Sequence, residues 1–316
     1  MNERSLKWIV LFETFLLILL LIKIVVDYKK DQIISRPNDG LLSKRIYAGL
    51  LEPKSYLVTN FYPLEKALRS YIKDNNFTVS IYVENLNNGA NFAIAERNGA
   101  FPGSINKIPL AVLILQKVES KQLDLNQRIN NQPHAPTIKE LLEKMLKDSD
   151  NDAFQSLGEL INKAELKKLM DYYSIDTYGA YNPNSTQIKD LLGPRDFSNI
   201  FSSLYFSTVL EPEHSEYILK LLTNTTFNLK ERADLPDDVK LAHKYGEYYI
   251  NNKLFHDCGI IYSATLRISY CVMTQGLEEN DAINVIAATV NTIYTYSSEL
   301  RAKLDNYKKN GLLTNT

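Results

Sequence analysis

The sequence FPGSINKIPLAVLIL, residues 101–115, decides the fold, because it joins a turn to the start of an apolar helix. Pro102 and Gly103 turn the chain, and Ser104 begins the helix. Lys107 follows one helical turn later, so its amine lies on the same face as the Ser104 hydroxyl and can reach it. The helix N-terminus adds free N–H groups and a positive dipole end, which stabilise an oxygen that becomes negative.

A β-hairpin is predicted immediately before this stretch. Phe77–Val83 (FTVSIYV) and Asn91–Ala95 (NFAIA) are rich in β-branched and aromatic residues, and the turn residues Asn87, Asn88 and Gly89 lie between them. The preceding segment, Tyr62–Lys73, has the apolar spacing of a helix.

The rest of the chain is predicted to be helical first and then β-rich. Ile105–Thr223 has mostly helical patterns, three apolar stretches follow at Val239–Ile250, Leu254–Ser263 and Arg267–Thr274, and Glu279–Asn306 is an amphipathic helix. We therefore expect a mixed α/β fold of the α+β kind. It has a five-stranded antiparallel sheet flanked by the terminal helices, an inserted all-helical lobe, and a cleft between sheet and lobe.

The Ser-x-x-Lys spacing is weak by itself, because it arises by chance about once in a few hundred residues. Ser70 and Lys73 form a second match, but they stand near the end of a predicted helix that runs into Asp74. We interpret this second match as a chance occurrence without a catalytic role, and we call it the decoy motif.

Two further short motifs are equally weak in isolation. Ser149-Asp150-Asn151 lies in a helix-to-helix loop, where Ser149 or Asp150 would serve as a helix cap. Lys244-Tyr245-Gly246 lies in the first late strand. A glycine within a strand marks the close approach of another backbone or of a ligand.

Together and in this order, the three motifs resemble the SxxK, SDN and KTG motifs of the serine β-lactamase and penicillin-binding protein superfamily. The resemblance is closest to class A β-lactamase-like domains and covers about residues 60–308. It extends to FPGS before the first motif, MLKDSDNDA around the second, PRDF at Pro194–Phe197 and HDCGIIY after the third.

The resemblance implies four catalytic side chains. Ser104 would be the nucleophile that forms an acyl-enzyme, and Lys107 would be its base, which requires a lysine that is neutral part of the time. We expect burial and the nearby positive Lys244 to lower the pKa of Lys107. Ser149 would pass a proton to the leaving nitrogen, and Asn151 would hydrogen-bond Lys107 and the substrate amide.

It also implies four residues that contact the substrate. Lys244 would attract a substrate carboxylate, Gly246 would let the acyl chain lie against the strand, and the backbone N–H groups of Ser104 and Glu247 would form the oxyanion hole. Tyr245 replaces a small hydroxyl residue of the family, and we expect its bulk to reshape the carboxylate site.

A second departure concerns release of the acyl group. Class A enzymes carry a glutamate in a loop after the SDN motif, but residues 171–194 contain no glutamate, and beyond Asp171 only Asp176 and Asp190 are acidic there. The sequence therefore supports acylation more firmly than hydrolysis. The functions left open are a β-lactamase-like hydrolase, a peptidoglycan D,D-peptidase or transpeptidase, and a non-catalytic sensor domain that keeps the fold.

The N-terminus is predicted to cross a membrane. Trp8–Val26 is apolar apart from Glu13, Thr14 and Lys23, and would span roughly 28 Å as a helix. We predict a signal anchor in residues 1–28, a linker in 29–59, the folded domain in 60–308 and a tail in 309–316. Flanking charges do not fix the orientation. The chemistry of the motifs leads us to expect a single-pass cell-membrane protein whose catalytic domain is extracytoplasmic.

Composition narrows the remaining choices. A formal net charge of −1 argues against nucleic-acid binding. The four histidines lack metal-ligand spacing, so neither a metal nor a cofactor is expected. Cys258 and Cys271 would lie opposite each other if their stretches form a hairpin, as a disulfide or as two buried thiols. The sequence does not indicate the oligomeric state.

Overall fold

The computed structural model describes most of the chain from residue 59 to residue 309. The described residues are 41, 59–96, 98–130, 132–175, 192–249, 253–264 and 266–309. Within them no helix is both long and apolar enough to cross a bilayer, and the predicted span Trp8–Val26 lies outside them. Asp176 and Asp190 also lie outside them.

A five-stranded antiparallel sheet forms the centre of the molecule, as predicted. Its strands are arranged in the order β2-β1-β5-β4-β3, so that β3, from the late part of the chain, lies at one edge. The strands are β1 (Thr78–Asn85), β2 (Asn91–Ile94), β3 (Lys240–Tyr248), β4 (Leu254–Tyr262) and β5 (Arg267–Gln275).

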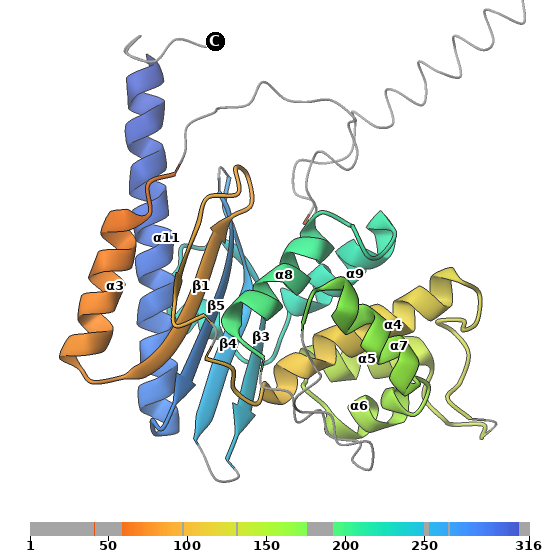
Figure 1. Ribbon diagram of the computed structural model, residues 1–316. Coiled ribbons are helices and arrows are strands. Elements are labelled where there is room, and N and C mark those ends of the chain that lie inside the picture. Colours follow the sequence, from red (N-terminus) through yellow and green to blue (C-terminus); the bar gives the residue numbers. More distant parts are fainter. Residues whose placement is uncertain are drawn as a thin grey trace, which may run out of the picture.

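Helices cover both faces of the sheet (Figure 1). The terminal helices α3 (Tyr62–Asp74) and α11 (Glu279–Lys309) pack on one face, which confirms the predicted arrangement. The inserted helices lie on the other face and beside β3. They are α4 (Lys107–Glu119), α5 (Ile138–Lys147), α6 (Asn151–Gly158), α7 (Lys163–Tyr172), α8 (Pro194–Tyr205) and α9 (Pro212–Leu222). The short helix α10 (Leu229–Arg232) is an exception, because it contacts α11.

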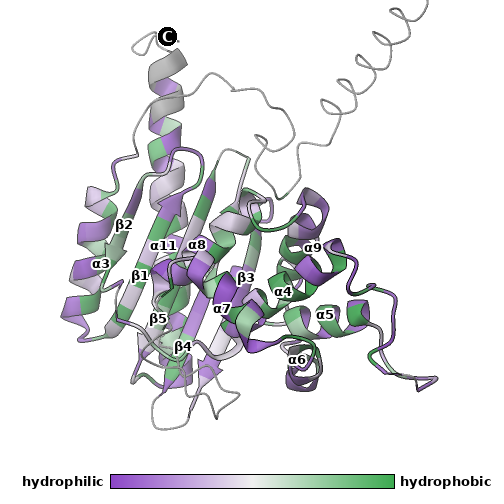
Figure 2. Cartoon of the chain, turned by 45° about the vertical axis from the view of Figure 1, so that its right-hand side comes forward, coloured by the Kyte–Doolittle hydropathy of each residue, from purple (hydrophilic) through white to green (hydrophobic). Residues whose placement is uncertain are grey.

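Two hydrophobic cores result, one on each side of the sheet, because successive strand residues point to opposite faces. In β5, Cys271 and Met273 belong to the core shared with the helical lobe, whereas Tyr270 and Val272 belong to the core under α3 and α11. Helix α4 is hydrophobic along most of its length (Figure 2), and its first nine residues are all buried. The helix that follows Ser104 is therefore held inside the protein.

The two cysteines meet across neighbouring strands. Cys258 in β4 is the register partner of Cys271 in β5, as the predicted hairpin requires. Both side chains are fully buried and are joined in a disulfide. Of the two alternatives that the sequence leaves open, the structure has the disulfide.

Candidate active site

The turn before α4 brings Ser104 to the junction of the sheet and the helical lobe. Gly103 has a φ of +56°, a left-handed conformation that glycine adopts without steric cost. Gly103–Asn106 then form one turn of 3-10 helix, and α4 begins at Lys107. The predicted helix therefore starts with a tighter turn, and Ser104 lies in that turn.

Lys107 is the centre of the predicted constellation. Its Nζ lies 2.8 Å from the Ser104 Oγ, 2.7 Å from the Asn151 Oδ1, and 2.7 and 3.2 Å from the carbonyl and hydroxyl oxygens of Ser149. These residues come from two segments of the chain, the turn at the start of α4 and the loop before α6. The structure thus brings together all four side chains that the resemblance implied as catalytic.

The loop that carries Ser149 is fixed by a helix cap. Asp150 is the N-cap of α6, and its carboxylate accepts a hydrogen bond of 2.7 Å from the Ala153 backbone N–H. Asp150 therefore organises the loop, as expected. Ser149 has a φ of 58°, which is uncommon for a residue other than glycine. Backbone strain of this kind is found at functional sites, where the surrounding structure holds it in place.

Burial lowers the pKa of Lys107 to about 8, because a charged ammonium loses its hydration inside the protein. The carboxylates of Asp150 and Glu247 act in the opposite direction. At neutral pH about a tenth of the Lys107 amines are therefore uncharged. A neutral amine 2.8 Å from a hydroxyl can accept its proton.

Lys244 lies on the face of β3 that meets the helical lobe. Only 3% of the residue is exposed, yet among the described residues none makes a hydrogen bond or an ion pair with its ammonium group. Burial and, next, the positive charge of Lys107 lower the pKa of Lys244 to about 8. A buried cation without a partner favours the binding of an anion from outside the chain.

Strand β3 and the nucleophile turn are in direct contact. A β-carbon on Gly103 would lie 2.5 Å from the Glu247 carbonyl oxygen and 2.8 Å from its backbone nitrogen. The backbone of Glu247 is therefore adjacent to the residue that precedes Ser104. This adjacency fits the expected oxyanion hole, in which the N–H groups of these two segments converge.

Tyr245 does not lie where the sequence interpretation expected it. Its ring stacks on Phe227, with centroids 4.0 Å apart, and lies 6.5 Å from the Phe255 ring. These contacts belong to the core under the terminal helices. Because side chains alternate along a strand, Tyr245 and Lys244 point to opposite faces. The expectation that Tyr245 reshapes the carboxylate site therefore does not hold.

The space beside Gly246 is also filled by the protein itself. A β-carbon there would lie 2.6 Å from the Pro102 carbonyl oxygen and 2.9 Å from a side-chain carbon of Ile105. Of the two readings of a strand glycine, close approach of another backbone is the one observed. Room for an acyl chain is not the reason that glycine is needed here.

A buried polar chain lies behind β3, and the sequence interpretation missed it. Asp257 is fully buried and accepts hydrogen bonds from the Tyr270 hydroxyl at 2.6 Å and from the His243 Nδ1 at 2.8 Å. The His243 Nε2 lies 3.1 Å from the Thr225 Oγ1. His243 directly precedes Lys244, so this chain fixes β3 next to the site. Asp257 was visible only as part of the HDCGIIY resemblance.

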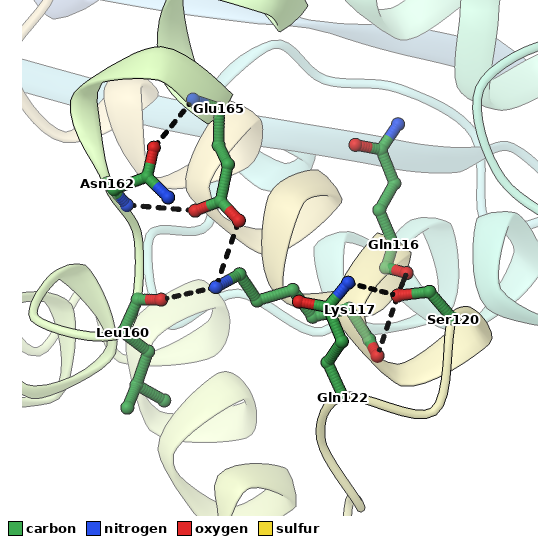
Figure 3. Close-up of polar contacts among 7 residues, drawn as sticks. All are labelled: Gln116, Lys117, Ser120, Gln122, Leu160, Asn162 and Glu165. Atoms are coloured by element: carbon green, nitrogen blue, oxygen red, sulfur yellow. Dashed lines mark hydrogen bonds and ion pairs between the residues drawn. The ribbon is translucent and has the colours of Figure 1, made fainter.

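The C-terminal end of α4 is hydrogen-bonded to the segment that begins α7 (Figure 3). The Lys117 Nζ donates to the Leu160 carbonyl oxygen at 2.8 Å and lies 3.0 Å from a carboxylate oxygen of Glu165. The same carboxylate and Asn162 form the capping box that begins α7. The helix that carries Lys107 is therefore anchored at both ends.

The second Ser-x-x-Lys match lies far from this constellation. Ser70 and Lys73 are exposed on α3, which packs on the opposite face of the sheet. Within the described part of the chain, no group of three or more His, Cys, Asp or Glu residues has the geometry to hold a metal ion.

The fold and the site define a class: a serine hydrolase with a lysine beside its nucleophile, placed between an antiparallel sheet and a helical lobe. Residues 63–297 match the β-lactamase enzyme family. The chain belongs to that family, and the predicted resemblance to the serine β-lactamase and penicillin-binding protein superfamily is confirmed.

Solved structures of low sequence identity share the fold. A β-lactamase from Chitinophaga pinensis has a TM-score of 0.66 at 18% identity, covering 74% of this chain and 99% of that one. TLA-1 extended-spectrum β-lactamase has a TM-score of 0.65 at 18%, with 75% and 99% covered. A mutant of PBP-A, in an acyl-enzyme complex with penicillin G, has a TM-score of 0.66 at 20%, with 79% and 100% covered. A search of curated proteins finds no match.

Proposed function

We propose that Ser104 attacks the carbonyl carbon of β-lactams, or of related amides that carry a carboxylate, and forms an acyl-enzyme. The observation that carries this proposal is the contact of the Lys107 Nζ with the Ser104 Oγ at 2.8 Å, in a site where burial lowers the pKa of the lysine to about 8. A hydroxyl is a weak nucleophile until a base takes its proton, and a partly neutral lysine at this distance is such a base.

The proton path follows from the same contacts. As the Ser104 Oγ bonds to the carbonyl carbon, its proton moves to neutral Lys107. The C–N bond of the amide then breaks, and the leaving nitrogen takes a proton from the Ser149 hydroxyl. Lys107 re-protonates that hydroxyl across their 3.2 Å contact. The Asn151 amide, whose oxygen accepts from Lys107 at 2.7 Å, keeps its NH2 group for the substrate.

The choice of a substrate with a carboxylate rests on Lys244. This ammonium is buried, has no partner among the described residues and lies on the lobe face of the edge strand. A bound carboxylate would provide the missing counter-charge. Both β-lactams and D-alanyl-D-alanine peptides carry such a group.

A second function is favoured by one specific observation, the absence of glutamate from residues 171–194. Without a carboxylate that activates water, the acyl-enzyme would persist until an amine or a slow hydrolysis removes it. A peptidoglycan D,D-peptidase or transpeptidase works in this way. The acyl-enzyme is common to both functions, and only its release separates them.

Intact-protein mass spectrometry after penicillin treatment tests the proposal, because it follows acylation and release separately over time. We expect one adduct per chain, lost in Ser104→Ala and kept in Ser70→Ala, the matched change at the decoy motif. Rapid loss of the adduct with turnover of a chromogenic cephalosporin identifies a β-lactamase. A lasting adduct with release of D-alanine from a pentapeptide identifies a peptidase. If no acylating probe labels Ser104, the domain is a non-catalytic sensor and the proposal fails.

We also propose that Trp8–Val26 anchors the protein in the cell membrane with the catalytic domain outside. The length and apolar character of this segment support the proposal. The Cys258–Cys271 disulfide supports an oxidising compartment. Protease added to intact cells should remove the domain, and complete protection in intact but not lysed cells would contradict this orientation.

A further inference from the structure

A buried histidine contacts the turn that carries the nucleophile. His256 is the third residue of β4 and is fully buried, and its Nε2 is 3.1 Å from the carbonyl oxygen of Phe101. Burial lowers the pKa of His256 to about 4, so the ring is neutral at physiological pH. A carbonyl oxygen only accepts hydrogen bonds, so the Nε2 carries the proton and donates it.

The position of His256 in the sheet explains this contact. His256 is the register partner of Gly246 in the edge strand β3. Gly246 has no side chain, and the Pro102 carbonyl oxygen occupies the space where a β-carbon would lie, at 2.6 Å. The FPG turn therefore rests on the sheet at Gly246, and the imidazole of the neighbouring strand holds the carbonyl group just before it.

Ser104 follows Phe101 by three residues, through Pro102, whose φ is fixed by its ring, and Gly103. A hydrogen bond to the Phe101 carbonyl therefore sets where the turn leaves the sheet. The position of the Ser104 Oγ relative to Lys107 and to the Glu247 backbone depends on that point. A misplacement of about 1 Å at a reacting atom can lower a rate about 100-fold.

We infer that His256 is a positioning residue for the acylation step: its Nε2–H bond to the Phe101 carbonyl holds the Pro102–Gly103 turn in the place from which Ser104 attacks. The inference rests on the proposed function, since it concerns the rate at which Ser104 is acylated. A merely structural role would change the stability of the domain without a specific effect on that rate.

Two substitutions at position 256 test the inference. Both introduce a side-chain amide, which can donate a hydrogen bond, but the two side chains differ in length. The side-chain amide nitrogen of glutamine in His256→Gln lies about as far from the backbone as the imidazole Nε2, whereas that of asparagine in His256→Asn ends near the position of the Nδ1. The glutamine variant can therefore donate to Phe101 and the asparagine variant cannot. His134→Gln, at an exposed histidine, is the control.

The measurements are the limiting rate of acylation by a fluorescent penicillin, the dissociation constant of the complex before acylation, and the melting temperature. We expect the acylation rate to fall about tenfold or more in His256→Asn and to stay within about threefold of the parent in His256→Gln. The dissociation constant should be unchanged in both variants, and His134→Gln should match the parent in all three measurements.

Equal acylation rates in the two variants overturn the inference, whether both match the parent or both fall together with the melting temperature. In either case the parent protein is acylated, so the proposed function stands. If the parent protein itself is not acylated, the proposed function fails, and the inference about His256 fails with it.

Discussion

Gly246 and Pro102 are in direct contact across the boundary between the sheet and the helical lobe. The Pro102 carbonyl oxygen lies 2.6 Å from the position that a β-carbon of Gly246 would occupy, a distance that real β-carbons essentially never show. One residue further along, the Glu247 backbone fills the corresponding space at Gly103. The edge strand and the nucleophile turn are therefore fitted to each other, and neither can move without the other.

Replacement of Gly246 by alanine should displace the turn. The atom that the new methyl group meets is backbone, which cannot rotate away, so we expect the acylation rate to fall about 100-fold. The free energy of unfolding should fall by about 1–3 kcal/mol, as for other overpacked positions. Labelling by a fluorescent penicillin and urea denaturation measure the two effects.

Gly158 provides the matched control for this substitution. It lies at the end of α6, and no atom lies within 4 Å of a β-carbon built there. Gly158→Ala should leave acylation unchanged and should stabilise the protein by up to about 1 kcal/mol, because alanine is the better helix former. If both alanine variants acylate at the parent rate, the turn tolerates displacement and the contact is unimportant.

The rate of acylation should depend on the charge of Lys107. The base is the neutral amine, and burial lowers its pKa to about 8, so the limiting acylation rate should rise with pH and level off above about pH 8. Stopped-flow acylation at saturating penicillin measures this profile. A rate that is flat between pH 6 and 9 would show that Lys107 is not the base.

Affinity for the substrate should change in the opposite direction because of Lys244. Its charged form would bind the carboxylate, and its pKa is lowered to about 8, so the dissociation constant before acylation should rise above that pH. The two lysines interact, and the measured values belong to the pair. Lys244→Arg should keep the affinity constant to about pH 10, because a guanidinium stays protonated. If Lys244→Arg lost affinity above about pH 8 to the same extent as the parent, deprotonation of Lys244 would not be the cause of that loss.

The buried chain behind β3 should contribute measurably to stability. Asp257→Asn keeps the shape of the side chain but removes the charge and one acceptor, while Tyr270 and His243 still direct donors at it. We expect the free energy of unfolding to fall by about 2–4 kcal/mol. Asp171→Asn, in an exposed ion pair with Lys167, should cost less than about 1 kcal/mol. Similar losses in both variants would contradict this account.

The sequence was sufficient for those features that depend on local pattern. Turn residues and stretches rich in β-branched and aromatic residues predicted the hairpin of β1 and β2, and the order of the elements predicted the sheet and the lobe. Ser104 and Lys107 could be paired because one helical turn separates them. Their contacts with Ser149 and Asn151 depended on the resemblance, since no local rule joins residues more than forty positions apart.

Features that depend on the face of a strand or on packing were not predicted. Tyr245 follows Lys244 in sequence and was expected to share its site, but strand alternation turns it toward Phe227. Gly246 could be read as space for a ligand or for backbone, and only the position of Pro102 decides between them. The partners of Asp257 and His256 come from other segments, so neither residue had a recognisable pattern of its own.

His256 should make the protein sensitive to acid, and this effect can be measured without any substrate. Its pKa is about 4 in the fold, against 6.5 for an imidazole exposed to water. Between these pH values the unfolded chain binds more protons than the folded one, so the free energy of unfolding falls as the pH falls from about 6.5, and the loss is complete below about pH 4. The full loss from this one group is about 3 kcal/mol.

The side chain in His256→Gln cannot titrate, so the variant does not lose this stability in acid. The free energy of unfolding of the parent, relative to that of the variant, should therefore fall by about 3 kcal/mol between pH 7 and pH 4. Other titrating groups act equally in both proteins and cancel in the difference, and His134→Gln, at an exposed position, should show no such shift. A parent-minus-variant difference that is the same at pH 7 and pH 4 would mean that His256 is already charged in the fold, and a charged ring would also have a second N–H group to satisfy inside the core.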